Sequence, residues 1–156
     1  MPTDATDFGW VSILRDEPDV QNSTNIKVGG ASCIWGYATS AMAVGDVVVV
    51  DTTADYSYTT TTSANATTVA GFVVASLNPG LDWDFVSAIA SGAKILIVKC
   101  GRVAATASTA ISRGARVGTS TTAGAVVTTT TQDASAGRAV TAATDAGDTI
   151  YVDVNA

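Results

Sequence analysis

The sequence predicts an all-β fold, a compact β-sandwich or barrel-like domain built from two similar β units. Runs of β-branched residues bounded by Gly, Asp and Asn recur along the chain, which is typical of strands joined by tight turns. Hydrophobic residues make up 47% of the 156 residues and charged residues only 14%, which is enough apolar material for one domain with its own core. Several segments of the first half also recur, with their glycines, in the second half.

The β-branched runs predict strands at residues 46–51, 68–76, 94–105, 137–143 and 148–154. The last run alternates between apolar and polar residues. We therefore expect Ile150, Val152 and Val154 to face the core, and Tyr151 and Asp153 to face outward. The valines at 47–50 do not alternate, which predicts a strand covered on both faces.

One segment favours a short helix over about residues 82–91. Asp82 or Asp84 would cap its start, and Gly92 would end it. Between them, apolar residues stand at helical spacing: Phe85, Val86, Ile89 and Ala90.

The first 40 residues differ in composition and predict an extended N-terminal arm with one or two strands. The β domain is then expected over 41–156. Four residues of the arm form a short apolar patch that we expect to contact a partner or another subunit: Phe8, Trp10, Ile13 and Leu14.

An internal repeat organises the predicted β domain into units at 41–100 and 110–154. Residues 41–50 match 110–119, residues 69–76 match 135–142, and residues 88–98 match 143–153. Matching glycines mark expected tight turns before strands: Gly45, Gly71, Gly92, Gly114, Gly137 and Gly147. The longer spacing from Gly71 to Gly92 makes the predicted helix an insertion into the first unit.

Composition argues against several classes of function. The net charge of −6 and the pI of about 4.2 leave no basic stripe for nucleic acid. No apolar run approaches the roughly 18 residues of a membrane span, and the acidic N-terminus does not resemble a secretory signal. Cys33 and Cys100 are interpreted as two buried thiols, with a disulfide left open.

Catalytic or metal chemistry is poorly supported. The chain has no histidine, so the commonest general base is absent. Asp82 and Asp84, and likewise Asp145 and Asp148, are better interpreted as cap and turn residues than as metal ligands, and no cofactor is expected. An enzyme with a backbone-built site remains a distant alternative, for which a pocket lined by Asp82, Asp84 and Lys94 would be the sign.

The chain resembles the capsid decoration (cement) proteins of tailed phages over about residues 94–154. The resemblance rests on the ending "AGRAVTAATDAGDTIYVDV" (136–154) and on the Thr-rich stretch before it. It implies a compact β domain that sits on an icosahedral shell, often as a trimer or dimer, and clamps neighbouring capsid subunits. That family offers no catalytic residues to carry over, and its shortest members lack the N-terminal arm and the insertion.

We therefore expect a structural protein that stabilises a bacteriophage capsid by binding across neighbouring major capsid subunits. It would lie on the outer surface of the virion after assembly in the host cytoplasm, and it would also associate with itself. The expected partners include neither nucleic acid nor membrane. The alternative from another class is a secreted or surface adhesin or fibre module.

Overall fold

The computed structural model describes residues 26–28, 31–77, 83–85 and 88–154, and within these ranges the chain is almost entirely β. The strands are β1 (Ile26–Val28), β2 (Ala31–Ala38), β3 (Val47–Val50), β4 (Ser57–Thr59), β5 (Val69–Leu77), β6 (Trp83–Asp84), β7 (Lys94–Thr106), β8 (Arg116–Thr119), β9 (Val126–Thr128), β10 (Gly137–Ala139) and β11 (Thr149–Val154). A single turn of 3-10 helix, η1 (Gln132–Ala134), lies between β9 and β10. The predicted all-β class is confirmed.

The first unit is a small closed barrel. β2 pairs in parallel with β4, β4 pairs with β3, β3 with β5, β5 with β7, and β7 pairs back with β2. Closure removes the free edges that a sheet of this size would otherwise expose. β1 and β6 add to the ring at β2 and β5 respectively.

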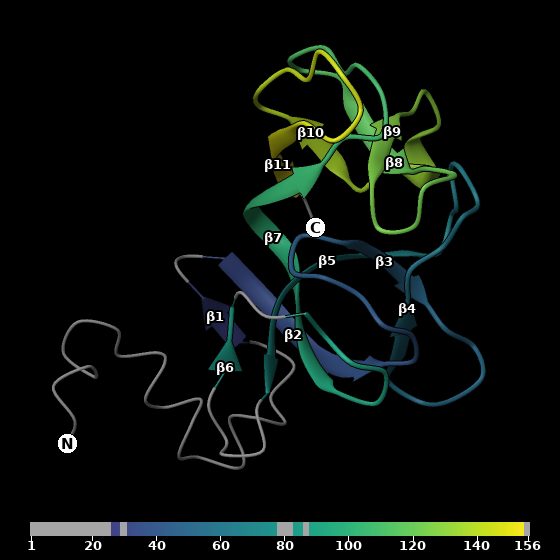
Figure 1. Cartoon of the computed structure of the whole chain (residues 1–156), viewed down its shortest axis with the longest axis vertical. Coiled ribbons are helices and arrows are strands. Elements are labelled where there is room, and N and C mark those ends of the chain that lie inside the picture. The colour runs from purple at the N-terminus through teal and green to yellow at the C-terminus, as the bar shows by residue number, and fades with distance from the viewer. Residues whose placement is uncertain (1–25, 29–30, 78–82, 86–87, 155–156) are drawn as a thin grey trace, which may run out of the picture.

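The second unit repeats this ring and shares a strand with the first. The C-terminal half of β7 pairs with β11, followed by β10, β8 and β9. A parallel bridge between Ala107 and Val126 then closes the ring, as the parallel pair Ala38 and Tyr58 does in the first unit. Figure 1 shows the two units stacked, with β7 running from one into the other.

The repeat extends to individual hydrogen bonds. Met42 and Ile89 exchange both backbone hydrogen bonds, at 3.0 and 2.8 Å, and Ile111 and Ala143 do the same at 3.0 and 2.9 Å. In the pairing pattern, β2 of the first unit corresponds to the second half of β7 in the second. Each unit therefore begins with a strand that lies before the matching segments at 41–50 and 110–119. Residues 31–38 therefore lie in the first barrel, while residues 1–25 of the expected arm lie outside the described residues.

Each barrel has an interior lined by counterpart residues, meaning residues at the same place in the pairing pattern. In the first unit these are Ala38, Met42, Val48, Ala70, Val73, Ile89, Ile95 and Ile97. In the second unit they are, in the same order, Ala107, Ile111, Val117, Ala136, Ala139, Ala143, Ile150 and Val152. All sixteen are buried, so the sequence repeat corresponds to two barrel interiors that are filled from equivalent positions.

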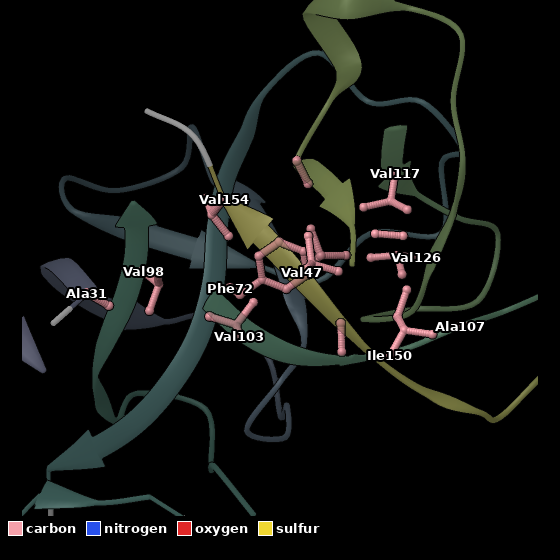
Figure 2. Packing of buried hydrophobic residues seen from close by; sticks show 14 of the residues in the cluster. Ala31, Val47, Phe72, Val98, Val103, Ala107, Val117, Val126, Ile150 and Val154 are labelled. Carbon is pink, nitrogen blue, oxygen red and sulfur yellow. The ribbon is translucent and has the colours of Figure 1, made fainter. Parts of the chain in front are cut away.

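The outer face of the first barrel packs against the interior of the second. Val47, Phe72 and Val98 belong to one hydrophobic cluster with Val103 and Val154 of the second unit. Figure 2 shows these side chains gathered where the two units meet. The β2–β7 pairing has a bulge between Ser32 and Cys33, near the point where β7 passes from the first barrel into the second. The interior of the second barrel is therefore continuous with the outer face of the first, while the interior of the first barrel forms a separate cluster.

The predicted helix at 82–91 is wrong for the described part of that segment. Trp83 pairs with Leu77 as part of β6 and is buried, and Ile89 forms the bridge to Met42. Helical spacing in a short apolar run does not distinguish a helix from strands, and here pairing with existing strands prevails. The segment is nonetheless an insertion relative to the second unit, where β10 leads almost directly to Ala143.

The glycines predicted at turns fall into two groups. Four of them lie in turns with φ between 82° and 98°: Gly45, Gly92, Gly114 and Gly147. Gly71 and Gly137 instead lie within β5 and β10, so their assignment to turns is corrected. A side chain at Gly71 would collide with the carbonyl oxygen of Val98, and one at Gly137 would collide with that of Asp153. Close backbone approach, not a turn, explains this glycine pair.

The burial pattern of the closing strand is confirmed. Ile150, Val152 and Val154 are buried, Tyr151 is exposed and Asp153 is half-buried. The non-alternating run in β3 is buried on both faces from Val47 to Val49, but Val50 is exposed, so the prediction fails at the end of the strand.

The cysteines differ from each other in burial. Cys33 is buried, whereas Cys100 is exposed, which corrects the interpretation of both as buried thiols. Both are free thiols.

Candidate interaction surface

Only some of the residues that the sequence suggested as possible sites lie within the described residues. Phe8, Trp10, Ile13 and Leu14 lie outside the described residues, as does Asp82. Asp84 lies on β6 opposite Ser76, and Lys94 lies on β7 opposite Tyr37. Within the described ranges there is no cluster of three or more His, Cys, Asp or Glu side chains fit to hold a metal ion.

Three aromatic rings and a lysine form a patch on the outside of the first barrel, which we call the aromatic patch: Trp35, Tyr37, Tyr56 and Lys94. The rings of Trp35 and Tyr56 stack, with centroids 5.0 Å apart and planes 30° apart. The Tyr37 ring meets Trp35 edge-on at 5.6 Å. Tyr37 and Tyr56 remain 40% and 61% exposed, whereas Trp35 is half-buried against the core cluster, so the two tyrosines present the exposed aromatic surface.

The lysine completes the aromatic patch from the neighbouring strand. Lys94 Nζ lies 4.5 Å from the centroid of the Trp35 ring, within range of a cation–π interaction. Partial burial lowers the pKa of Lys94 from its usual value. The ammonium group is thereby already partly desolvated, which reduces the cost of covering it with a partner.

The local fold positions the rings. Trp35 and Tyr37 lie two residues apart on β2 and so point to the same face. Gly36 between them leaves room on the other face for the ring of Tyr58, which a side chain there would strike. The Tyr37 amide donates a hydrogen bond of 2.8 Å to the Tyr56 carbonyl oxygen and ties the turn before β4 to β2.

The backbone of Tyr56 is in the left-handed region, with φ of 56°. Bulky residues seldom adopt this conformation, which costs on the order of 1 kcal/mol relative to glycine. Its counterpart in the turn before β9 is Gly124, with φ of 77°. The repeated turn therefore requires a positive φ. The second unit meets this requirement with glycine, whereas the first unit keeps an exposed tyrosine in spite of the strain.

This arrangement suits recognition of another macromolecule. Partly exposed Trp and Tyr rings bury large areas at little cost in side-chain entropy, and they dominate the binding energy of many protein interfaces. Strain at a non-glycine residue is often associated with function. The sequence alone does not predict the patch, because residues 31–38 fall within the expected arm. A signal is present in the "WGY" of 35–37, which places two aromatics at strand spacing.

The fold is similar to a solved structure described as "The crystal structure of head fiber gp8.5 N base in bacteriophage phi29". The TM-score is 0.54, with 15% sequence identity over 79% of this chain and 92% of that chain. The likeness shows a shared fold. No protein-family model and no curated protein sequence matches the chain. Among the described residues, no helix has the length and apolar character needed to cross a membrane.

Proposed function

We propose that this chain is a structural protein of a bacteriophage particle and that it decorates and stabilises the capsid. The observation that carries the proposal is the fold shared with the N base of the phi29 head fibre, a structural protein of a phage head. The resemblance of residues 94–154 to capsid decoration proteins supports the same role from the sequence. The described residues also offer an aromatic surface suited to binding another macromolecule.

Stabilisation would follow from mass action. A protein that binds the assembled shell, and not the dissociated subunits, shifts the equilibrium toward the shell by RT ln(1 + [L]/Kd). In this proposal the aromatic patch contacts the shell across neighbouring major capsid subunits. Copies of the chain arranged as dimers or trimers would match the symmetry of such a surface.

A fibre module is the second candidate, and the likeness to the base of a head fibre favours it. The two roles differ in where further mass lies. A decoration protein covers the shell as a compact layer, whereas a fibre base carries a segment that projects from it. Electron microscopy of particles that carry the chain distinguishes the two roles.

The test is binding to empty phage shells that lack this protein. We expect the chain to co-sediment with shells and to raise their melting temperature. Tyr56→Gly should weaken binding at least tenfold, because it removes the stacked ring. The same change should alter the free energy of unfolding by no more than about 1 kcal/mol, since relief of the positive φ offsets the lost ring contact.

The matched control is Tyr151→Gly. Tyr151 is an exposed tyrosine, 50% accessible, on β11 of the second unit and is not part of the aromatic patch. We expect its loss to leave shell binding unchanged. A chain that remains in the supernatant at saturating shell concentrations would contradict the proposed function. Equal loss with both variants would contradict the assignment of the patch.

A further inference from the structure

A row of charged side chains crosses the outer face of the second barrel, and we call it the arginine row. Arg102 on β7 is directly opposite Asp153 on β11, and Asp153 is directly opposite Arg138 on β10. Arg138 in turn is directly opposite Arg116 on β8. Directly paired residues of adjacent strands point to the same face, so the four side chains stand in line.

The corresponding row of the first barrel is apolar. Its members, in the same order, are Cys33, Val98, Phe72 and Val47, and all are buried. In the first unit this face is a site of packing against other parts of the chain. In the second unit the same face carries charge and is open to solvent, with Arg102 and Asp153 side chains 58% and 43% exposed.

One end of the arginine row is internally paired. Arg102 Nε lies 2.7 Å from Asp153 Oδ1, and Arg102 Nη2 lies 3.0 Å from Asp153 Oδ2. The hydrogen bonds from Arg102 lower the pKa of Asp153, so this carboxylate is committed to its neighbour. The pair leaves the remaining two arginines without an acid between them.

The other end holds two like charges face to face. Arg138 and Arg116 are directly opposite each other, an arrangement that is unfavourable unless an anion lies near both. The Arg138 guanidinium is held in place by a 3.1 Å hydrogen bond from Nη1 to the Gly114 carbonyl oxygen. Its fork is thus oriented before any ligand arrives, which reduces the entropy lost on binding.

A pocket of about 280 Å³ lies at this end of the arginine row. Arg116, Arg138, Gln132, Ser135 and Gly137 line it, and no acid is among them. The guanidinium and amide donors match the acceptor oxygens of a carboxylate, which arginine binds through two parallel hydrogen bonds.

We propose that the arginine row binds the acidic N-terminal segment of a second copy of this chain. The chain has a net charge of −6 and only eight Lys and Arg residues, and the arginine row gathers three of them around a single aspartate. The first 19 residues provide the complement, with five acids and a single arginine: Asp4, Asp7, Asp16, Glu17, Asp19 and Arg15. One copy therefore supplies the cationic face and the next supplies the carboxylates.

Charge reversal on each side provides the test, with the full chain used throughout. The row variant is Arg116→Glu with Arg138→Glu. The segment variant is Asp16→Lys, Glu17→Lys and Asp19→Lys. We expect sedimentation equilibrium to show self-association of the wild type, weakened at 0.5 M salt, and at least tenfold weaker association for each variant alone.

Mixing the two variants should restore association, because the row variant still carries the acidic segment and the segment variant still carries the arginine row. Arg113→Glu is the matched control, since Arg113 is exposed in a turn of the same unit outside the row. It should associate like the wild type. Thermal melts check that every variant is folded. A monomeric wild type, variants that associate normally, or a mixture no stronger than its components would each overturn the proposal.

Discussion

The two barrels share one pairing pattern and differ on their outer faces. Inside, counterpart positions are apolar in both units, with smaller residues in the second. Outside, the first unit has Phe72 and Val98 where the second has Arg138 and Asp153. The difference teaches that closure and interior packing define this fold, whereas the outer face is free to specialise for what lies against it.

The insertion belongs to the same contrast. It adds Trp83 and Phe85 to the cluster that contains the outer face of the first unit, where apolar residues need cover. The second unit lacks the insertion, and its outer face has Arg138 and Asp153 in place of the apolar Phe72 and Val98. The insertion is therefore found in the unit whose outer face is apolar, as expected if burial of apolar area stabilises the inserted segment.

Exchanging the outer-face residues should give the largest effect. Phe72→Arg places a charge in the hydrophobic cluster where the two units meet, which costs more than about 5 kcal/mol through lost burial and desolvation of the guanidinium. Since whole domains are stable by only about 5–15 kcal/mol, we expect this variant not to fold. Circular dichroism and thermal melts measure the effect.

The reciprocal change, Arg138→Phe, tests whether the contrast is real. It replaces an exposed side chain, so the free energy of unfolding should change by no more than about 0.5 kcal/mol. Similar destabilisation by both substitutions would mean that the outer faces of the two barrels are equally buried, and the comparison would be wrong.

Substitution of two glycines of the first unit, one in a crowded strand and one in an open turn, should have intermediate effects on stability. Gly71→Ala should destabilise by about 2–4 kcal/mol, because the new methyl group meets the Val98 carbonyl oxygen and the strands must separate. Gly92→Ala should cost only about 1 kcal/mol, since the space around it is open and only the positive φ is unfavourable. Urea denaturation separates the two values. If Gly92→Ala is as costly as Gly71→Ala, backbone conformation outweighs close approach at both sites.

The thiols should show the smallest effect, without any loss of stability. Burial raises the pKa of Cys33 to about 11, and the residue is only 1% exposed, so at pH 8 it stays protonated and inaccessible. Cys100 is exposed. A thiol reagent should modify one cysteine per native chain and both in denaturant. Peptide mapping should place the fast reaction at Cys100. Rapid modification of Cys33 would show that the first barrel opens more readily than its buried core suggests.

The sequence predicted the repeat and the buried face of the last strand because both are periodic. Alternation in the last strand specified the buried faces of Ile150 and Val152, and glycine spacing aligned residues 41–50 with 110–119. Both signals are local and follow from strand geometry. By contrast, the strand at 83–84 depends on pairing with β5, which no local spacing reveals. Nor could the sharing of β7 be seen, since its two halves read as one long run.

The candidate surfaces were harder to predict than the fold. Trp35 and Tyr56 are far apart in the sequence and meet only because β2 and β4 pair in parallel. The arginine row draws on four strands whose order follows from closure of the second barrel. Such groupings depend on long-range register, so they become visible only once the strand order is known.

The shared strand β7 also fixes the distance between the two surfaces. No linker separates the barrels, because the strand that completes one continues as the first strand of the other. The aromatic patch and the arginine row therefore lie on two units that one continuous strand joins directly. When one surface engages, the other is presented at a high effective concentration to any target with matching spacing. Such a two-barrel chain gains avidity only from a target whose two binding sites are spaced so that both surfaces can bind at the same time.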